Sequence, residues 1–328
     1  MAKKRVYESV VDAIGNTPII RLNRITKGLT PTIYVKWEAT NPGGSIKDRI
    51  APFIIRDFEN KGLLKPGGTI VEATSGNTGV GLAICGIQKG YKMVACMSSK
   101  QSIDKVNVLK AYGVEVHVCP AEVGPDDPLS YYSVARKIAT ERPGAVLANQ
   151  YHNPANALTH YETTGPEIWD QMDGDLAYFA AGVGTGGTIS GTSRFLKEKN
   201  PAIQVFGIDP VGSILTEYHR SGKMTEAKKY LIEGIGEDII PGNVHFKYID
   251  EMVPVSDQES ITALHRLAKE EGIFAGSSCG AAIAGALKVA KKLPAGNMLV
   301  VLPDNGNKYL AKFYNPEWLA SQGIKVEV

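Results

Sequence analysis

One lysine stands directly after a glycine-rich turn in the stretch TNPGGSIKDRIA, residues 40–51. The letters NPGG are typical of a turn, and the segment after them has apolar residues at helical spacing. The pattern therefore predicts that Lys47 lies on a turn at the start of a helix. An amine in such a place can form a Schiff base or act as a general base. The simpler interpretation is a solvated surface charge, because most lysines are exposed.

A glycine-rich loop, GVGTGG at residues 182–187, lies between an apolar strand pattern and a helical pattern. It matches G-x-G-x-x-G, and Asp209 follows at the end of the next strand, as in a dinucleotide-binding unit. The underlying physics is less specific, since N–H groups at a helix N-terminus bind any phosphate. The phosphate of a smaller cofactor would fit equally well. A third interpretation is a tight turn that needs glycine for its dihedral angles.

A second loop, EATSGNTG at residues 72–79, gathers neutral hydrogen-bonding groups where another helix should begin. Its hydroxyl and amide side chains are those of Thr74, Ser75, Asn77 and Thr78. Together with free N–H groups they suit a carboxylate. Simple helix capping is the alternative, although a cap needs only one such residue.

A third helix start is predicted in AGSSCGAAIAGALKVAKKL. We expect Ser278 to be the N-cap of a helix over about residues 279–292. The helix dipole disfavours a positive charge at this point, so the hydroxyl is suited to a neutral ring nitrogen. An ordinary cap without a ligand is the alternative.

Several segments consist of a short apolar strand, a glycine-rich turn and a helix. Near-continuous apolar strands that alternate with helices predict an α/β fold with parallel sheets covered on both faces. Two groups of such segments are separated by ANQYHNPANALTHYETTGPEIWDQ. We therefore predict two α/β domains with the active site between them.

Composition excludes several function classes. The net charge of +2 gives no electrostatic case for nucleic acid or an anionic membrane. No run approaches the roughly 18 apolar residues of a membrane span, and the N-terminus lacks the apolar core of a secretory signal. The cysteines are scattered without CxxC spacing, which favours buried thiols over disulfides or a metal site. They are Cys85, Cys96, Cys119 and Cys279. The default compartment is the cytoplasm.

Five segments occur in the order NPGGSIKDR, EATSGNTG, GVGTGGTISG, IEGIGEDIIP and AGSSCGAA. They resemble the signature segments of the cysteine synthase/cystathionine β-synthase family of fold-type II pyridoxal-phosphate enzymes. The resemblance covers about residues 8–320 and implies the tryptophan synthase β-like fold. It implies a larger cofactor-binding domain, residues 1–45 plus 151–328, and a smaller, mobile substrate-binding domain, residues 46–150.

The resemblance also implies a role for each motif residue. Lys47 would hold pyridoxal 5'-phosphate as a Schiff base, the internal aldimine, and later move the substrate Cα proton on the way to an aminoacrylate. Asn77 would lie beside the ring oxygen and Ser278 beside the ring nitrogen. The phosphate would be held by Gly184, Thr185, Gly186, Gly187 and Thr188. The substrate would contact Thr74, Ser75, Asn77, Thr78, Gln150, Tyr151, Gly234 and Gly236.

Five stretches are more similar to the cystathionine β-synthase branch than to the cysteine synthase branch. They are KVNVLKAYGVEV, the long loop before SYYSVARKIA, NALTHYETT, DPVGSIL and VVLPDNGNKYLAKFYNPEWL. This implies β-replacement on L-serine or O-acetylserine with homocysteine, giving L-cystathionine. No cysteine precedes Cys85 and no histidine precedes His117, so we expect no haem. We expect no regulatory modules after the core either. Glu237 stands where the animal enzymes have tyrosine, which affects the second-substrate pocket.

Three other functions stay open at this point. A cysteine synthase using O-acetylserine and sulfide shares motifs such as TSGNTG. A dehydrogenase using the G-x-G-x-x-G loop leaves Lys47 and Ser278 unexplained. A scaffold protein that kept only the fold would not need the lysine and both loops. The expected partners are small amino acids and thiols, and the expected assembly is a homodimer.

Overall fold

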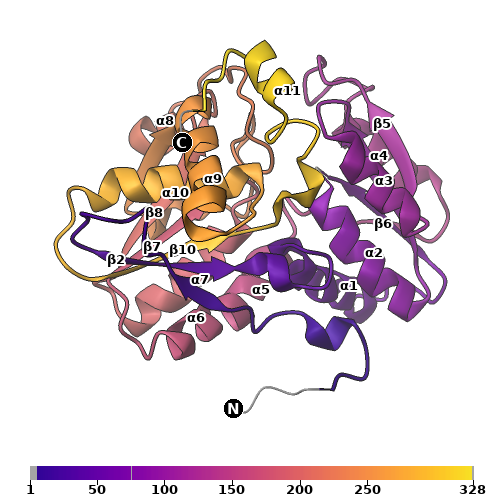
Figure 1. Cartoon of the computed structure of the whole chain (residues 1–328). Coiled ribbons are helices and arrows are strands. Elements are labelled where there is room, and N and C mark those ends of the chain that lie inside the picture. The colour runs from indigo at the N-terminus through magenta and orange to yellow at the C-terminus, as the bar shows by residue number, and fades with distance from the viewer. Residues whose placement is uncertain (1–5, 75, 327–328) are drawn as a thin grey trace. The chain divides into compact units, whose positions relative to one another are not determined.

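The computed structural model describes residues 6–74 and 76–326 (Figure 1). This part of the chain divides into two compact units. Unit 1 comprises the described residues up to Asn16 and Thr40–Ala155, and unit 2 comprises Thr17–Ala39 and the described residues from Asn156 onwards.

The unit boundaries differ from the predicted domain boundaries near the N-terminus. Residues 6–16 and 40–45 belong to unit 1, whereas the prediction placed them in the larger domain. Val11 and Ile14 pack against the core of unit 1, and the Gly15 N–H donates to Asn41 Oδ1 at 2.8 Å. These contacts explain why the segment before Thr17 joins unit 1.

Unit 1 contains a four-stranded sheet in the order β5-β4-β3-β6, with every pair parallel. Its strands are β3 (Thr69–Ala73), β4 (Lys92–Ser98), β5 (Glu115–Cys119) and β6 (Ala145–Leu147). Its helices are η1 (Val11–Ala13), η3 (Ile46–Arg49), α1 (Ile50–Asn60), α2 (Asn77–Lys89), α3 (Ile103–Ala111) and α4 (Tyr131–Glu141).

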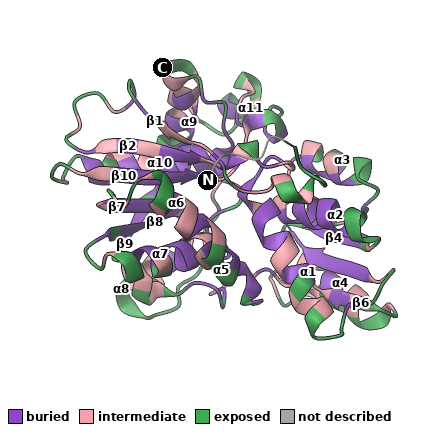
Figure 2. Ribbon diagram, turned by 90° about the horizontal axis from the view of Figure 1, so that it is seen from below, coloured by how far each residue is buried: buried purple, intermediate pink, exposed green. Residues whose placement is uncertain are grey.

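Both faces of this sheet are buried, as Figure 2 shows for β4. Ile70 and Ala95 point into a core that includes residues of α1 and α2. Their chain neighbours Val71 and Val94 point the other way, into a second core with Ala135 of α4. The alternation explains why the strands are apolar throughout.

Unit 2 contains a six-stranded sheet in the order β1-β2-β10-β7-β8-β9, in which only the β1–β2 pair is antiparallel. Its strands are β1 (Ile19–Arg21), β2 (Thr32–Trp37), β7 (Tyr178–Gly182), β8 (Gln204–Pro210), β9 (Glu251–Val255) and β10 (Asn297–Leu302). Its helices are η4 (His160–Thr164), α6 (Gly165–Gln171), α7 (Gly187–Lys199), α8 (Leu215–Ser221), η5 (Phe246–Tyr248), α9 (Asp257–Glu271), α10 (Ser277–Ala290), η6 (Gly306–Lys308) and α11 (Pro316–Ser321). At the unit boundaries lie η2 (Glu38–Thr40) and α5 (Ala155–Thr159).

The main core of unit 2 lies between its sheet and the helices α9 and α10. Tyr178 and Ala180 of β7 point into this core together with Ile283 of α10. Phe179, between them, is fully buried but lies outside this core, and α7 packs against β7. The prediction of two mostly parallel α/β sheets is therefore confirmed.

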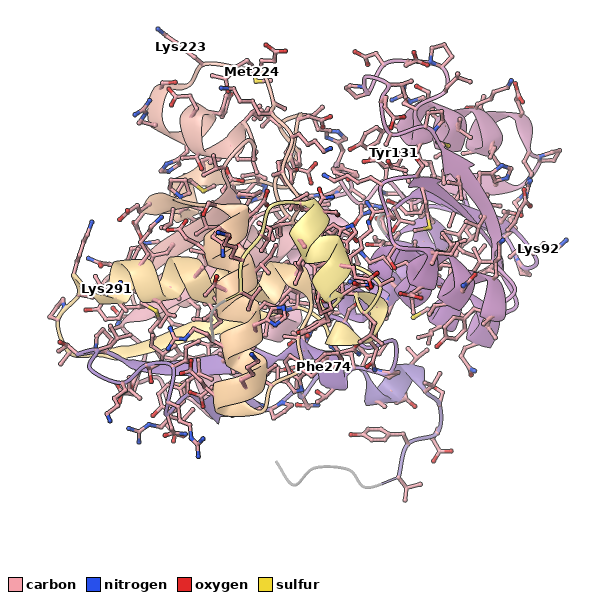
Figure 3. The ribbon with its side chains drawn as sticks, turned by 45° about the horizontal axis from the view of Figure 1, so that its top comes forward. Lys92, Tyr131, Lys223, Met224, Phe274 and Lys291 are labelled. Atoms are coloured by element: carbon pink, nitrogen blue, oxygen red, sulfur yellow. The ribbon has the colours of Figure 1, made fainter. Side chains whose placement is uncertain are left out.

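Two connecting loops are exposed. Residues 120–129 between β5 and α4, which are rich in proline and aspartate, are mostly exposed. After α8, Lys223 and Met224 project away from the ribbon, and Met224 is 58% exposed (Figure 3).

The four cysteines are buried and unbonded, as predicted. Among the described residues there is no group of three side chains suited to hold a metal ion. Within the same residues, no helix combines the length and the apolar character needed to cross a membrane.

Candidate active site

Lys47 lies in the short helix η3, directly before α1, as the sequence predicted. The Gly44 N–H donates to the Asn41 carbonyl at 2.8 Å and closes the turn, where Gly44 has a φ of 75°. Ser45 Oγ then accepts the Lys47 N–H at 3.2 Å and caps η3. Lys47 is half-buried, so it is not an ordinary solvated surface lysine.

Helix α2 fixes the backbone of Lys47 by close contact. A Cβ atom on Gly81 would lie 2.8 Å from the Lys47 carbonyl oxygen and 3.0 Å from Asp48 Cα. The buried Asp48 carboxylate in turn accepts the Gly43 N–H at 2.5 Å. The position of the lysine thus depends on a glycine in the next helix and a carboxylate at its side.

Lys36 is another buried lysine, but its environment is that of a structural residue. Its ammonium donates to the Thr17 carbonyl at 2.8 Å, Glu167 Oε2 at 3.0 Å and Gln171 Oε1 at 2.7 Å. Three oxygen partners stabilise the charged form, so this amine is not suited to nucleophilic chemistry.

The structure brings together three of the predicted substrate-binding residues, Thr74, Thr78 and Gln150. Thr74 Oγ1 accepts the Gly76 N–H at 2.9 Å. The Thr78 hydroxyl donates to Gln150 Oε1 at 2.7 Å, and Gln150 Nε2 donates to the Ala73 carbonyl at 3.2 Å. We call the segment from Thr74 to Thr78 the carboxylate loop. Ser75 lies outside the described residues.

Two further predicted residues are Asn77, within this loop, and Tyr151. Asn77 is the first residue of α2, after Gly76 with a φ of 121°. Tyr151 follows Gln150 and packs against tyrosines of α4. Its ring lies 5.3 Å from that of Tyr132, and its hydroxyl lies 3.4 Å from that of Tyr131 (labelled in Figure 3).

Glu72 of β3 contacts Gln150, and the sequence motifs indicated no role for it. Its side chain is fully buried, and its Oε1 accepts the Gln150 N–H at 3.4 Å. Burial raises the pKa of this carboxyl to about 8, although the N–H groups of Gln150 and Asn149 and the charge of Lys47 oppose the shift. An acid within the apolar strand TIVEA was the signal that could have revealed it.

In unit 2, the segment GVGTGG forms the predicted connection from β7 to α7, and we call it the phosphate loop. A Cβ atom on Gly184 would lie 2.7 Å from the Gly234 carbonyl oxygen, and one on Gly187 would lie 1.9 Å from Asn156 Oδ1. Gly186 is the N-cap, with a φ of 87°. The first turn of α7 has no acidic residue, so its N–H groups suit an anion.

The two threonines of this region have buried polar neighbours. Asn156 Nδ2 donates to Thr185 Oγ1 at 3.0 Å. Thr188 Oγ1 lies 3.2 Å from Nε2 of His160, whose Nδ1 lies 2.8 Å from Thr164 Oγ1. His160 begins a π-helix, a rare form that is frequent at functional sites. No sequence motif indicated a role for Asn156 or His160.

Gly234 and Gly236 lie beside the phosphate loop. The Gly236 N–H donates to the Val183 carbonyl at 2.8 Å. Both glycines have left-handed backbones, with φ of 88° and 77°. A side chain at either position would therefore be strained.

The prediction that Ser278 is the N-cap of α10 is wrong. The helix begins at Ser277, and its N-cap is Gly276 in an extended conformation with no side-chain cap. Ser277 Oγ is used elsewhere, since it accepts the Glu233 N–H at 3.2 Å. Ser278 therefore lies within the first turn, where it is 5% exposed. Its hydroxyl forms no hydrogen bond with the part of the chain that the structure describes.

These residues fit pyridoxal phosphate. The close approaches at Gly184 and Gly187 leave backbone N–H groups, not side chains, at the start of α7. Ser278 supplies a neutral hydroxyl inside unit 2, and Lys47 supplies an amine in unit 1. A phosphate requires N–H donors, a neutral ring nitrogen requires a hydroxyl donor, and an aldehyde requires an amine to react with. These residues supply all three kinds of group.

The alternative dinucleotide interpretation requires an acidic residue that contacts the ribose, and Asp209 does not have that role. Asp209 Oδ2 accepts the N–H of Thr216 at 2.9 Å and its hydroxyl at 2.7 Å. The buried carboxylate is thus used to hold the start of α8 and is not presented to a ribose.

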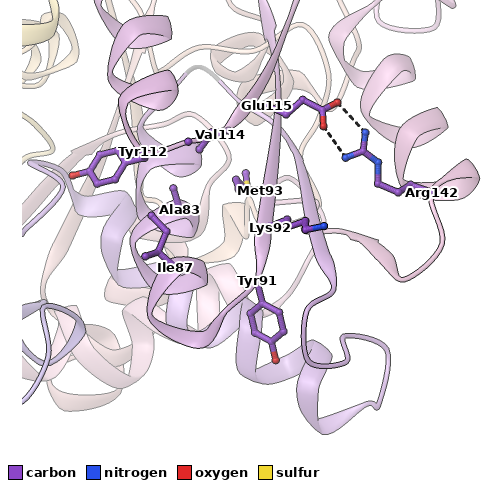
Figure 4. A pocket seen from close by; sticks show the side chains of 10 residues that line it. Ala83, Ile87, Tyr91, Lys92, Met93, Tyr112, Val114, Glu115 and Arg142 are labelled. Atoms are coloured by element: carbon purple, nitrogen blue, oxygen red, sulfur yellow. Dashed lines mark hydrogen bonds and ion pairs between the residues drawn. The ribbon is translucent and has the colours of Figure 1, made fainter.

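A hollow of about 290 Å³ in unit 1 contains none of the predicted site residues (Figure 4). It is lined by Ala83, Ile87, Tyr91, Lys92, Met93, Tyr112, Gly113, Val114, Glu115 and Arg142. Glu115 and Arg142 form a two-pronged ion pair at 2.8 and 2.9 Å, which lowers the pKa of Glu115 to about 2. Neither group is thereby prepared for acid–base chemistry at neutral pH.

A parallel α/β fold, a half-buried lysine at a helix start and a glycine-rich phosphate loop define an enzyme class that uses a phosphate-bearing cofactor. The chain belongs to the family of pyridoxal-phosphate dependent enzymes, whose family model matches residues 10–304. Similar solved structures are fold-type II enzymes of this kind, which confirms the predicted fold class.

Named relatives fall into both predicted branches. Cystathionine beta-synthase of Apis mellifera is 44% identical over 98% of this chain and 64% of its own length. Cysteine synthase 1 of Emericella nidulans is 41% identical over 96% of this chain and 87% of its own length. The crystal structure of an O-acetylserine dependent cystathionine beta-synthase from Helicobacter pylori has a TM-score of 0.87 and 35% identity. That match covers 94% of this chain and 99% of the other.

The chain spans just under two thirds of the length of the first curated relatives. The covered share is 64% for the Apis mellifera protein and 64% for that of Dictyostelium discoideum.

Proposed function

We propose that this chain catalyses β-replacement on L-serine or O-acetylserine with homocysteine, giving L-cystathionine. The observation that carries the proposal is the Lys47 turn, capped by Ser45 and held by Gly81, in a pyridoxal-phosphate dependent enzyme. Identities of 41–44% to relatives named cystathionine beta-synthase support homocysteine as the thiol.

In the proposed site, each residue keeps the role that the motifs suggested. Pyridoxal phosphate, when bound, supplies an electron sink for the substrate carbon that loses its proton. The Lys47 amine holds the cofactor, then takes the Cα proton and returns it at the end of the reaction. The phosphate loop with Thr185 and Thr188 binds the phosphate. Asn77 contacts the ring oxygen.

The substrate is held by its carboxylate. Thr74, Ser75, Thr78 and Gln150 would hold it through hydroxyl and amide groups, which suits an amino acid without the need for an arginine. The Thr78 hydroxyl would then have to turn away from Gln150 Oε1. Tyr151 and the glycines Gly234 and Gly236 border the space for the substrate.

Ser278 sets the electronic character of the proposed site. A hydroxyl beside the ring nitrogen leaves that nitrogen uncharged, whereas a carboxylate would keep it protonated. An uncharged ring stabilises a carbanion weakly. This favours departure of the β-substituent as the proton is removed, and it disfavours transamination.

A cysteine synthase activity with O-acetylserine and sulfide is the second candidate. The chain covers 87% of the length of the Emericella nidulans cysteine synthase 1 at 41% identity, which is a specific reason to keep it.

The finer organisation belongs to the same proposal. Unit 2 binds the cofactor, and unit 1 is the mobile substrate-binding unit. The protein acts as a homodimer in the cytoplasm, with pyridoxal phosphate and without haem.

The test offers the purified protein L-serine or O-acetylserine, each with homocysteine or sulfide, and identifies products by mass spectrometry. Cystathionine as the fastest product supports the proposal. Cysteine from O-acetylserine and sulfide, with little cystathionine, would assign the chain to the cysteine synthases. A Lys47→Ala variant is the control for background reactions.

A further inference from the structure

Glu72 occupies a position that the proposed reaction does not yet explain. It lies on β3, two residues before the carboxylate loop, and its side chain has no exposed surface. Among the described residues its Oε2 has no hydrogen-bond partner. An ionised carboxylate is costly to bury when one of its oxygens has no hydrogen-bond partner. Burial therefore strongly favours the protonated form of Glu72.

The turn after β6, which Glu72 contacts, has an uncommon backbone conformation. Asn149 has a φ of 54°, which is uncommon for a residue other than glycine. The next residue, Gln150, donates its N–H to Glu72 Oε1 at 3.4 Å. The Gln150 side chain then reaches Thr78 and the Ala73 carbonyl. Glu72 therefore holds the backbone of Gln150, whose side chain contacts the carboxylate loop at Thr78.

Few charged or titratable groups interact with this carboxyl. They are Lys47 from the turn before α1 and the Cys96 thiol of the adjacent strand β4. The neutral groups that interact with it are the N–H groups of Asn149 and Gln150, in the turn after β6, and the Gln150 side chain.

We propose that Glu72 is a positioning residue that orients Gln150 through the Asn149 turn and must be uncharged when a substrate carboxylate binds. The inference rests on the proposed function of the carboxylate loop. An ionised Glu72 would place a negative charge one hydrogen-bonded residue away from the substrate carboxylate. It would therefore weaken amino-acid binding as the pH rises.

The first test measures the apparent Kd of L-serine for the cofactor-loaded protein by calorimetry between pH 6.5 and 9.5. Wild type is compared with Glu72→Gln, and Glu59→Gln on α1 is the matched charge control. The pKa of Glu72 is about 8, so the wild-type Kd should rise about tenfold relative to that of Glu72→Gln by pH 9. Comparison at equal pH cancels the titration of serine. A ratio that stays constant with pH would overturn the proposal.

The second test needs no substrate. Hydrogen exchange of the peptide that contains Asn149 and Gln150 should accelerate in Glu72→Ala and stay near wild type in Glu72→Gln. Unchanged exchange in Glu72→Ala would show that Glu72 does not hold the turn. A wild-type protein that binds neither L-serine nor O-acetylserine at any pH would instead overturn the proposed function itself, so the two failures are distinguishable.

Discussion

At the scale of single residues, chemistry depends on which polar groups are already used by the fold. Lys36 and Asp209 have hydrogen-bond partners that fix them in structural roles. Ser278 keeps a neutral hydroxyl at the start of α10, and Glu72 keeps a buried carboxyl beside Gln150. We therefore propose that Ser278 and Glu72 set the electrostatic properties of the proposed site.

Replacement of Ser278 by aspartate should slow β-replacement and increase side reactions. A carboxylate there would raise the pKa of the ring nitrogen and keep it protonated, and the bound cofactor would then be a stronger electron sink that permits other reactions. We expect a loss of at least about tenfold in kcat/KM, which corresponds to about 1.4 kcal/mol of transition-state stabilisation. Product analysis by mass spectrometry measures both effects.

Ser278→Ala is the control, because it removes the hydroxyl without adding charge. It should lower the rate without raising transamination. Equal rates for wild type and Ser278→Asp would refute the role assigned to this serine.

At the scale of elements, the sequence predicted most of what positions the site. The turn before Lys47 and the connections from β3 to α2 and from β7 to α7 were predicted, because glycine and alternating apolar runs are local signals. The start of α10 was misplaced by two residues because Gly276, Ser277 and Ser278 compete for the cap. The Asn156–Thr185 contact could not be predicted, since it joins residues 29 positions apart.

Helix α2 offers a matched pair of substitutions. Gly81→Ala places a methyl group within 2.8 Å of the Lys47 carbonyl oxygen, whereas at Gly86 the nearest atom would be 3.7 Å away. Gly86→Ala should be neutral or stabilising by about 0.5–1 kcal/mol, as expected for alanine in a helix. Gly81→Ala should displace Lys47 and reduce covalent cofactor attachment. Thermal unfolding and the absorbance of the bound cofactor measure the two effects.

Equal cofactor content in the two alanine variants would show that α2 does not control the lysine. A loss of folding in Gly86→Ala, where a Cβ atom would make only ordinary contacts, would contradict the packing of α2 described above.

At the scale of the whole molecule, each unit has its own sheet, parallel in unit 1 and mostly parallel in unit 2, and its own buried core. The phosphate loop and Ser278 belong to unit 2, and Lys47 and the carboxylate loop belong to unit 1. Each unit therefore supplies a different half of the chemistry that we propose.

Binding of pyridoxal phosphate should stabilise the protein through unit 2 even without the lysine. At a ligand concentration about 100 times Kd, linkage predicts a gain of about 2.7 kcal/mol in the free energy of unfolding. Lys47→Ala should keep part of this gain, since the phosphate contacts remain. Pyridoxal, which lacks the phosphate, should raise the free energy of unfolding only slightly. Equal stabilisation by both compounds would argue against the phosphate loop.

The central claim is that Lys47 carries the cofactor. The most direct measurement is borohydride reduction of the cofactor-loaded protein, followed by proteolysis and mass spectrometry of the lysine peptides. We predict one pyridoxyl adduct, on the peptide that contains Lys47, and none in Lys47→Ala. An adduct on another lysine such as Lys36 or Lys105, or no adduct in a yellow holoprotein, would contradict this account.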